Sequence, residues 1–141
     1  MKHTEITVKA VVENTIPVMN FVDAEFKRNG FPMQAEILTA VEEIFINIAS
    51  YAYTPDNIGE AKVSVAIDGT GTAVLCFKDW GMPYNPLEKA APDFSIPVHE
   101  RKIGGLGIHF VKELVDKVEY EYSDKTNILT ITKAIGKGES S

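Results

Sequence analysis

The sequence predicts an α+β fold, a two-layer sandwich in which three helices cover one face of a mixed, mostly antiparallel sheet. Some segments alternate apolar and polar residues, as half-buried strands do, and others repeat apolar residues every three or four positions, as amphipathic helices do. These segments follow the order strand, helix, helix, strand, strand, long loop, helix, strand, strand. The sequence Asp68-Gly69-Thr70-Gly71 is a strong hairpin signal between two of the strands. Strands grouped in this way, with helices between the groups, are typical of an α+β protein.

The first half of the chain contains one predicted strand and two predicted helices. Residues 4–12 alternate as a strand does. The first helix begins at Asn14 or Thr15 and ends at Asn29-Gly30, where glycine favours a helix stop. The second helix runs from about residue 32 to residue 53. The expected apolar faces are Ile6, Val8, Ala10 and Val12 for the strand, Ile16, Met19, Val22 and Phe26 for the first helix, and Ile37, Val41, Ile44, Phe45, Ile48 and Ala52 for the second.

The second half begins with two predicted strands, residues 60–68 and 72–79, which the hairpin turn joins. Residues 80–103 follow neither periodicity and contain four prolines, so we expect a binding loop or a lid there. A glycine cluster at 104–107 then leads into a helix that buries Ile108, Val111, Leu114 and Val115. Strands at 117–123 and 127–133 close the fold.

Composition narrows the possible functions. The 141 residues predict one domain, residues 1–135, followed by a flexible tail, residues 136–141. The formal net charge is −6, which argues against a nucleic-acid-binding surface. The single cysteine, Cys76, cannot form an internal disulfide, and this suits a reducing compartment. No stretch approaches the roughly 18 apolar residues of a membrane span, and the first residues do not resemble a signal peptide. We therefore expect a cytoplasmic protein that contacts neither nucleic acid nor membrane.

Three segments could support chemistry. The first is a helical stripe of Glu43, Asn47 and Tyr51, which are spaced four residues apart. An amide oxygen there could coordinate a hard metal such as Mg²⁺, and a carboxylate one turn away could accept a proton. A solvated polar face of the helix would give the same pattern.

The second and third segments could bind a nucleotide. Asp79, at the end of a strand, could accept a hydrogen bond from the exocyclic amine of a base, and Gly81 permits the close approach of a ligand. A plain turn with an exposed tryptophan is the alternative. Residues 104–108, Gly-Gly-Leu-Gly-Ile, open a helix, where backbone N–H groups could bind a phosphate. A structural turn is the alternative for this segment.

Together, and in this order, the three segments resemble the GHKL ATPases. Glu43-x-x-x-Asn47 resembles the N box, Asp79-x-Gly81-x-Pro83 the first glycine box, and Gly105-x-Gly107 the second. Across nearly its whole length the chain is most similar to the small bacterial anti-sigma factor serine kinases, which share the residues that follow the first two boxes, Ala52-Tyr53 and Pro83-Tyr84-Asn85-Pro86-Leu87. This resemblance implies the GHKL fold and two cofactors, ATP and Mg²⁺.

The resemblance also implies a role for each motif residue. Glu43 would be the general base, Asn47 would ligate Mg²⁺, and Asp79 would bind the adenine amine. Thr130, in the last strand, would support adenine through a water molecule, and residues 85–103 would form the ATP lid. The full set implied at the nucleotide is Asn47, Tyr51, Asp79, Gly81, Arg101, Lys102, Gly104, Gly105, Leu106, Gly107, Ile108 and Thr130.

Two positions depart from the family pattern. Residue 51 is Tyr where many relatives have His. Residue 103 is Ile where some relatives have an Arg that meets the terminal phosphate, while Arg101 and Lys102 lie just upstream.

The resemblance implies a protein serine/threonine kinase that phosphorylates a small antagonist of the STAS fold. Such a kinase regulates a sigma factor by partner switching, and its relatives commonly form homodimers. The alternative is a nucleotide-dependent binding module that sequesters a regulatory partner and transfers no phosphoryl group.

Overall fold

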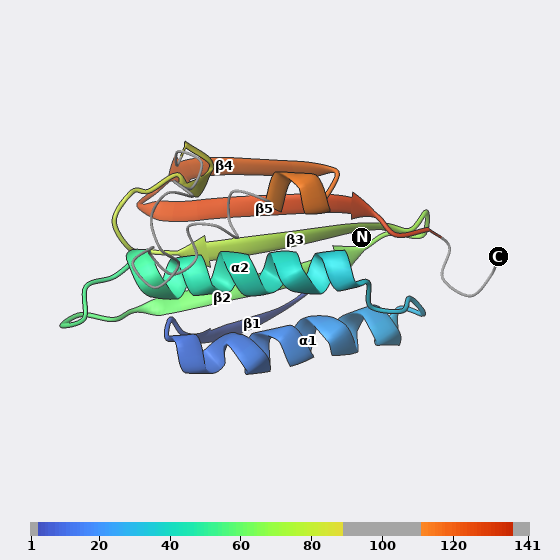
Figure 1. Ribbon diagram of the computed structural model, residues 1–141, viewed down its shortest axis with the longest axis horizontal. Coiled ribbons are helices and arrows are strands. Elements are labelled where there is room, and N and C mark those ends of the chain that lie inside the picture. Colours follow the sequence, from blue (N-terminus) through green and yellow to red (C-terminus); the bar gives the residue numbers. More distant parts are fainter. Residues whose placement is uncertain (1–2, 89–110, 137–141) are drawn as a thin grey trace, which may run out of the picture.

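The computed structural model describes residues 3–88 and 111–136, which form an α+β fold as the sequence predicts. Five antiparallel strands make one sheet in the order β1-β2-β3-β5-β4. Figure 1 shows the helices packed on one face of this sheet. The strands are β1 (His3–Lys9), β2 (Glu60–Ile67), β3 (Thr72–Asp79), β4 (Lys117–Ser123) and β5 (Thr126–Ala134).

Two helices cover the sheet, α1 (Thr15–Arg28) and α2 (Ala35–Tyr51), and residues 111–114 are also helical. Short 3-10 turns, η1 (Val12–Asn14) and η2 (Pro86–Glu88), precede α1 and follow β3. The core lies between helices and sheet, because every second strand residue faces the helices. Its largest fully buried side chains are Phe26, Phe45, Phe77, Ile37, Ile44, Leu75, Ile131, Val18, Val22, Val41 and Val63.

The β2–β3 hairpin places the end of β3 beside the end of α2. Its turn is closed by the Asp68 carboxylate, which accepts from the backbone N–H of Thr70 at 2.9 Å and of Thr72 at 3.0 Å. The resulting register pairs Ala61 with Asp79. Asp79 is the last residue of β3, and its buried place in the alternating pattern puts it on the helix-covered face of the sheet.

The apolar faces expected for the first strand and first helix are partly wrong. The strand ends at Lys9, and Val12 lies in η1 with half of its side chain exposed. In α1, Val18 is fully buried, whereas Ile16 is 60% exposed. The helix packs through the face that contains Val18, Val22 and Glu25, and Ile16, two residues before Val18, lies on the opposite face. The expected helix stop is confirmed, since Gly30 has a φ of +85°.

Several expectations concern residues outside the described ranges. They include most of the proposed lid, the glycine cluster and the C-terminal tail. Within residues 3–88 and 111–136, no helix is long and apolar enough to cross a membrane.

Candidate functional site

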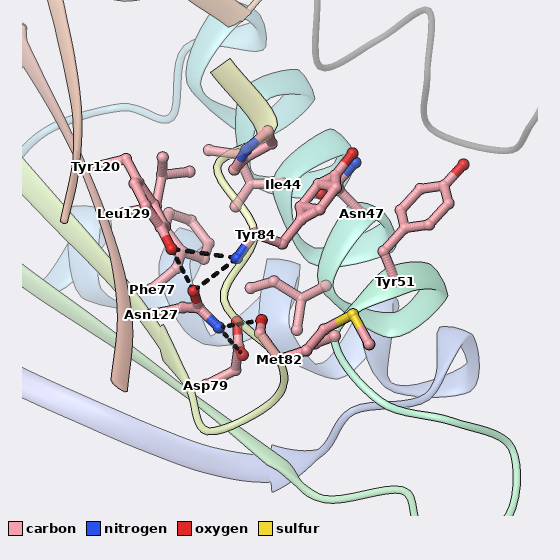
Figure 2. A pocket seen from close by; sticks show the side chains of 13 residues that line it. Ile44, Asn47, Tyr51, Phe77, Asp79, Met82, Tyr84, Tyr120, Asn127 and Leu129 are labelled. Carbon is pink, nitrogen blue, oxygen red and sulfur yellow. Dashed lines mark hydrogen bonds between the residues drawn. The ribbon is translucent and has the colours of Figure 1, made fainter. Parts of the chain in front are cut away.

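A pocket opens between the C-terminal half of α2 and the sheet. Figure 2 shows that its walls come from α2, from the end of β3 and the segment after it, and from β4 and β5. The lining residues are Ile44, Asn47, Ile48, Tyr51, Ala52, Phe77, Asp79, Met82, Tyr84, Pro86, Tyr120, Asn127 and Leu129. The fold thus brings the first two predicted motifs together at one site.

Asn47 lies on the pocket side of α2, between apolar core residues. Its side chain is 4% exposed, and its Nδ2 atom has no hydrogen-bond partner among the described residues. A buried amide without a partner is costly for the fold and indicates a group that binds something else. The carboxamide oxygen is suitable for Mg²⁺, so the chemistry of Asn47 fits the expected metal ligand, whereas the unpaired N–H group is a donor for an acceptor such as a phosphate oxygen.

Glu43 lies one helical turn before Asn47 and is half-buried. Burial raises the pKa of its carboxyl group above the ordinary value, and the neighbouring negative charge of Glu42 raises this pKa further. A raised pKa makes a carboxylate a better proton acceptor. Glu43 does not line the pocket itself, but it lies near the pocket's edge on the same stripe as Asn47 and Tyr51.

Asp79 is the buried acidic group of the pocket, with 5% of its side chain exposed. Its Oδ1 atom accepts hydrogen bonds from the backbone N–H of Gly81 and from Asn127 Nδ2, both at 2.9 Å. Burial raises the pKa of Asp79, and these two hydrogen bonds oppose that rise. No donor to its Oδ2 atom occurs in the part of the chain that the structure describes. Asp79 can therefore accept one further hydrogen bond, for example from an amine.

The acidic, His and Cys side chains of residues 3–88 and 111–136 do not form a metal site by themselves. No group of three or more His, Cys, Asp or Glu side chains there could hold a metal ion. Magnesium commonly binds through one or two protein groups together with substrate phosphates and water. Asn47 fits such a shared site.

Gly81 has a packing role in addition to the one expected. A Cβ atom at this position would lie 1.9 Å from the carbonyl oxygen of Ala52, which follows α2. The backbone N–H of Met82 donates to the same oxygen at 3.1 Å. Glycine is therefore required for the segment after β3 to pack against the end of the helix, whether or not a ligand approaches it.

Tyr53 fastens this corner of the site. Its hydroxyl donates to the carbonyl of Glu60 at 2.6 Å and accepts from the backbone N–H of Trp80 at 2.9 Å. A Cβ atom at Gly59 would lie only 2.5 Å from a ring carbon of Tyr53, so the ring packs against this glycine. Tyr53 thus joins the start of β2 to the residue after β3.

Tyr51 and Tyr84 form an aromatic wall of the pocket. Their ring centroids are 5.7 Å apart and the rings are nearly parallel, with an interplanar angle of 10°. Tyr51, expected at the nucleotide, thus lies at the pocket and connects α2 with the segment after β3.

Thr130 does not lie in the pocket. It pairs with Cys76 across β3 and β5, and strand alternation places both residues on the face away from the helices. The pocket side of β5 carries Asn127 and Leu129 instead. The expected contact of Thr130 with adenine is therefore corrected, because Thr130 and Asp79 lie on opposite faces of the sheet.

Like Tyr84, Asn127 is a site residue that sequence reasoning missed. It pairs with Asp79 in the sheet register and is 5% exposed. One sequence signal for it is an asparagine at the start of a strand, where asparagine is uncommon.

The remaining residues expected at the nucleotide lie outside the described ranges. They are Arg101, Lys102, Gly104, Gly105, Leu106, Gly107 and Ile108.

Comparison with known protein families identifies the family to which the chain belongs. The model of the histidine kinase-like ATPase domain matches residues 8–133, which is most of the chain. The chain belongs to the histidine kinase-like ATPase family. Membership in this ATPase family implies ATP binding, and the expected GHKL relationship is confirmed.

A solved structure has the same fold. It is a crystal structure of the RsbU and RsbW domains of Rv1364c from Mycobacterium tuberculosis. Its sequence is 18% identical to this chain, and the two structures superpose with a TM-score of 0.66. The match covers 96% of this chain and 33% of that one, so this ATPase-family chain spans about a third of the length of its structural relative. A comparison with curated proteins gives no significant match.

Proposed function

We propose that the chain is an ATP-dependent protein serine/threonine kinase of the anti-sigma factor type that acts in the cytoplasm. Support comes from its membership in the histidine kinase-like ATPase family and from its likeness in fold to a protein with an RsbW domain. The motif resemblance to anti-sigma factor serine kinases supports the same function.

The observation that carries the proposal is the arrangement on α2. A half-buried carboxylate with a raised pKa, Glu43, lies one turn from a buried amide with incomplete bonding, Asn47. A domain that only bound a nucleotide would need no proton acceptor there. A phosphoryl-transfer enzyme needs a base for the acceptor hydroxyl and a ligand for the metal.

The remaining roles follow from the pocket. Asp79 would accept a hydrogen bond from the adenine amine, and Tyr51 and Tyr84 would border the nucleotide. Asn47 would hold Mg²⁺, which neutralises phosphate charge when it is bound. Glu43 would take the proton of the acceptor hydroxyl. The hydroxyl oxygen would bond to the terminal phosphorus of ATP as the bond between that phosphorus and ADP breaks.

The proposed acceptor is a seryl or threonyl hydroxyl of a small STAS-fold antagonist, and the second partner is a sigma factor. A new phosphate would add about −1.5 to −2 charges to the antagonist. Since this chain has a net charge of −6, repulsion would favour release of the phosphorylated product. The chain would then be free to hold its sigma factor.

The test replaces Glu43 by Gln and measures transfer from labelled ATP to a panel of STAS-fold proteins. Glu43→Gln should lower transfer by about 100-fold or more, because the base is lost, and leave ATP affinity unchanged. Glu42→Gln is the matched control, since Glu42 is the adjacent carboxylate and is also half-buried, and it should retain most of the activity. Transfer by Glu43→Gln at the rate of the unaltered protein would refute the proposed base. ATP binding without transfer to any panel member would favour the sequestering module.

A further inference from the structure

The Asn127 side chain joins β5 to both ends of the segment that follows β3. Its Nδ2 atom donates to Asp79 Oδ1 and to the carbonyl of Met82, both at 2.9 Å. Its Oδ1 atom accepts from the hydroxyl of Tyr120 and, at 3.2 Å, from the backbone N–H of Tyr84. Figure 2 shows these bonds converging on Asn127 at the floor of the pocket.

These partners determine which way the carboxamide points. Both acceptors, Asp79 and Met82, lie on one side of Asn127, and both donors, Tyr84 and Tyr120, lie on the other. A rotation by 180° would turn an oxygen toward two oxygens and an NH₂ group toward two donors. The network therefore holds a single orientation of Asn127.

This orientation decides what the pocket offers to a base. Asp79 Oδ1 is already engaged by Gly81 and Asn127, so the other carboxylate oxygen is the acceptor left for a ligand. Both N–H donors of Asn127 are also engaged, so Asn127 has no donor left for a carbonyl group on the base. An amine finds an acceptor at this point, whereas an oxo group meets a carboxylate.

We propose that Asn127 is a positioning residue that sets a preference for 6-aminopurine over 6-oxopurine nucleotides. It does so by orienting the carboxylate of Asp79 and by withholding its own N–H groups from the base. The proposal rests on the proposed binding of ATP with its base at Asp79.

The test compares the affinities of ATP and inosine triphosphate (ITP) by calorimetry in magnesium. Asn127→Leu retains the approximate shape without hydrogen bonds. Asn127→Asp, measured at pH 8, retains the shape with acceptor oxygens only. We expect the preference of the unaltered chain for ATP over ITP to fall about tenfold in both variants, the equivalent of about 1.4 kcal/mol. Thr130→Val, on the opposite face of β5, is the matched control and should retain the preference.

A purely structural role would weaken the two nucleotides equally and leave their ratio unchanged, which would overturn the proposal. An unaltered chain that binds ATP and ITP equally, or a ratio that changes only in Thr130→Val, would also overturn it. If Asn127→Leu does not fold, the ratio for Asn127→Asp decides. The ATP binding on which the proposal rests fails differently, since the unaltered chain would then bind neither nucleotide, and failure of the proposed kinase activity would appear as ATP binding without phosphoryl transfer.

Discussion

Two buried polar side chains on neighbouring helices, Glu25 of α1 and Asn47 of α2, differ in their bonding. Each is 4% exposed. Glu25 Oε1 accepts from the Thr4 hydroxyl at 2.6 Å, and Glu25 Oε2 pairs with Arg28 at 3.0 Å. Asn47 Nδ2 has no such partner within residues 3–88 and 111–136.

The difference separates a residue that serves the fold from one that is available to a ligand. The bonds of Glu25 connect α1 to β1 and to the last turn of α1, so both of its carboxylate oxygens have partners within the protein. Asn47 is shielded from water, but its N–H group gains no hydrogen bond in exchange, and the residue faces a pocket. Substitutions at the two sites should therefore affect different measurements.

The largest expected effect is at Asn47. Asn47→Leu should lower ATP affinity in magnesium by about 100-fold, or about 2.7 kcal/mol, because a metal ligand is lost. The same substitution should have little effect on ATP affinity in EDTA. Since the amide has an unbonded N–H group, thermal stability should stay equal or rise. Calorimetry with and without magnesium, together with a melting curve, tests each part, and an equal loss in EDTA would remove Asn47 from the metal.

The opposite outcome is expected at Thr4. Thr4→Val removes a hydrogen bond to a buried carboxylate, which should lower the free energy of unfolding by about 1.5–3 kcal/mol. ATP affinity should not change. Thr7→Val, at an exposed position on the same strand, is the control. Denaturant titration checks the loss, and weaker ATP binding in the folded Thr4→Val variant would contradict the separation between the two helices.

A third substitution tests whether Asp79 belongs with the site. Asp79→Asn retains an oxygen for the Gly81 and Asn127 bonds but loses the charge, so we expect ATP affinity to fall about tenfold. Unchanged affinity would mean that the carboxylate does not meet the base.

The difference in stability between Asp79→Asn and the unaltered chain should depend on pH in a defined direction. Because burial raises the Asp79 pKa in the folded state, its contribution favours folding below the ordinary carboxyl pKa and is lost as pH rises through the folded value. Asp79→Asn should remove this loss, so its stability relative to the unaltered chain should increase between acidic and neutral pH. Chemical unfolding at several pH values measures the difference, and a constant difference would show that the folded and unfolded pKa values are alike.

Local patterns were sufficient for most of the fold. The bounds predicted for β3 and β4 match the structure, and all six apolar residues expected inside α2 are buried. In both cases the periodicity runs through an uninterrupted element. In α1, Val22 and Phe26 are buried and Met19 packs against the core as expected, and Ile16 alone was wrong because Val18 takes the core-facing position in that turn.

The site was predictable only where one element carries the pattern. Glu43, Asn47 and Tyr51 share one helix, so their spacing alone places them together. Thr130 and Asn127 differ by three positions in one strand and therefore face opposite sides, and only the pairing of Asp79 with Asn127 shows which of them reaches the pocket. The need for glycine at Gly81 likewise arises from Ala52, a contact between separate elements.

The tyrosine fastening at the corner of the site also has a practical consequence. Trp80, whose backbone N–H is held by Tyr53, is the single tryptophan of the chain, and 44% of its side chain is exposed. It lies between Asp79 and Gly81 in the sequence. Indole fluorescence from this protein therefore comes from one place beside the pocket, so an unlabelled sample carries its own optical probe for ligand titrations and for stopped-flow measurements of unfolding.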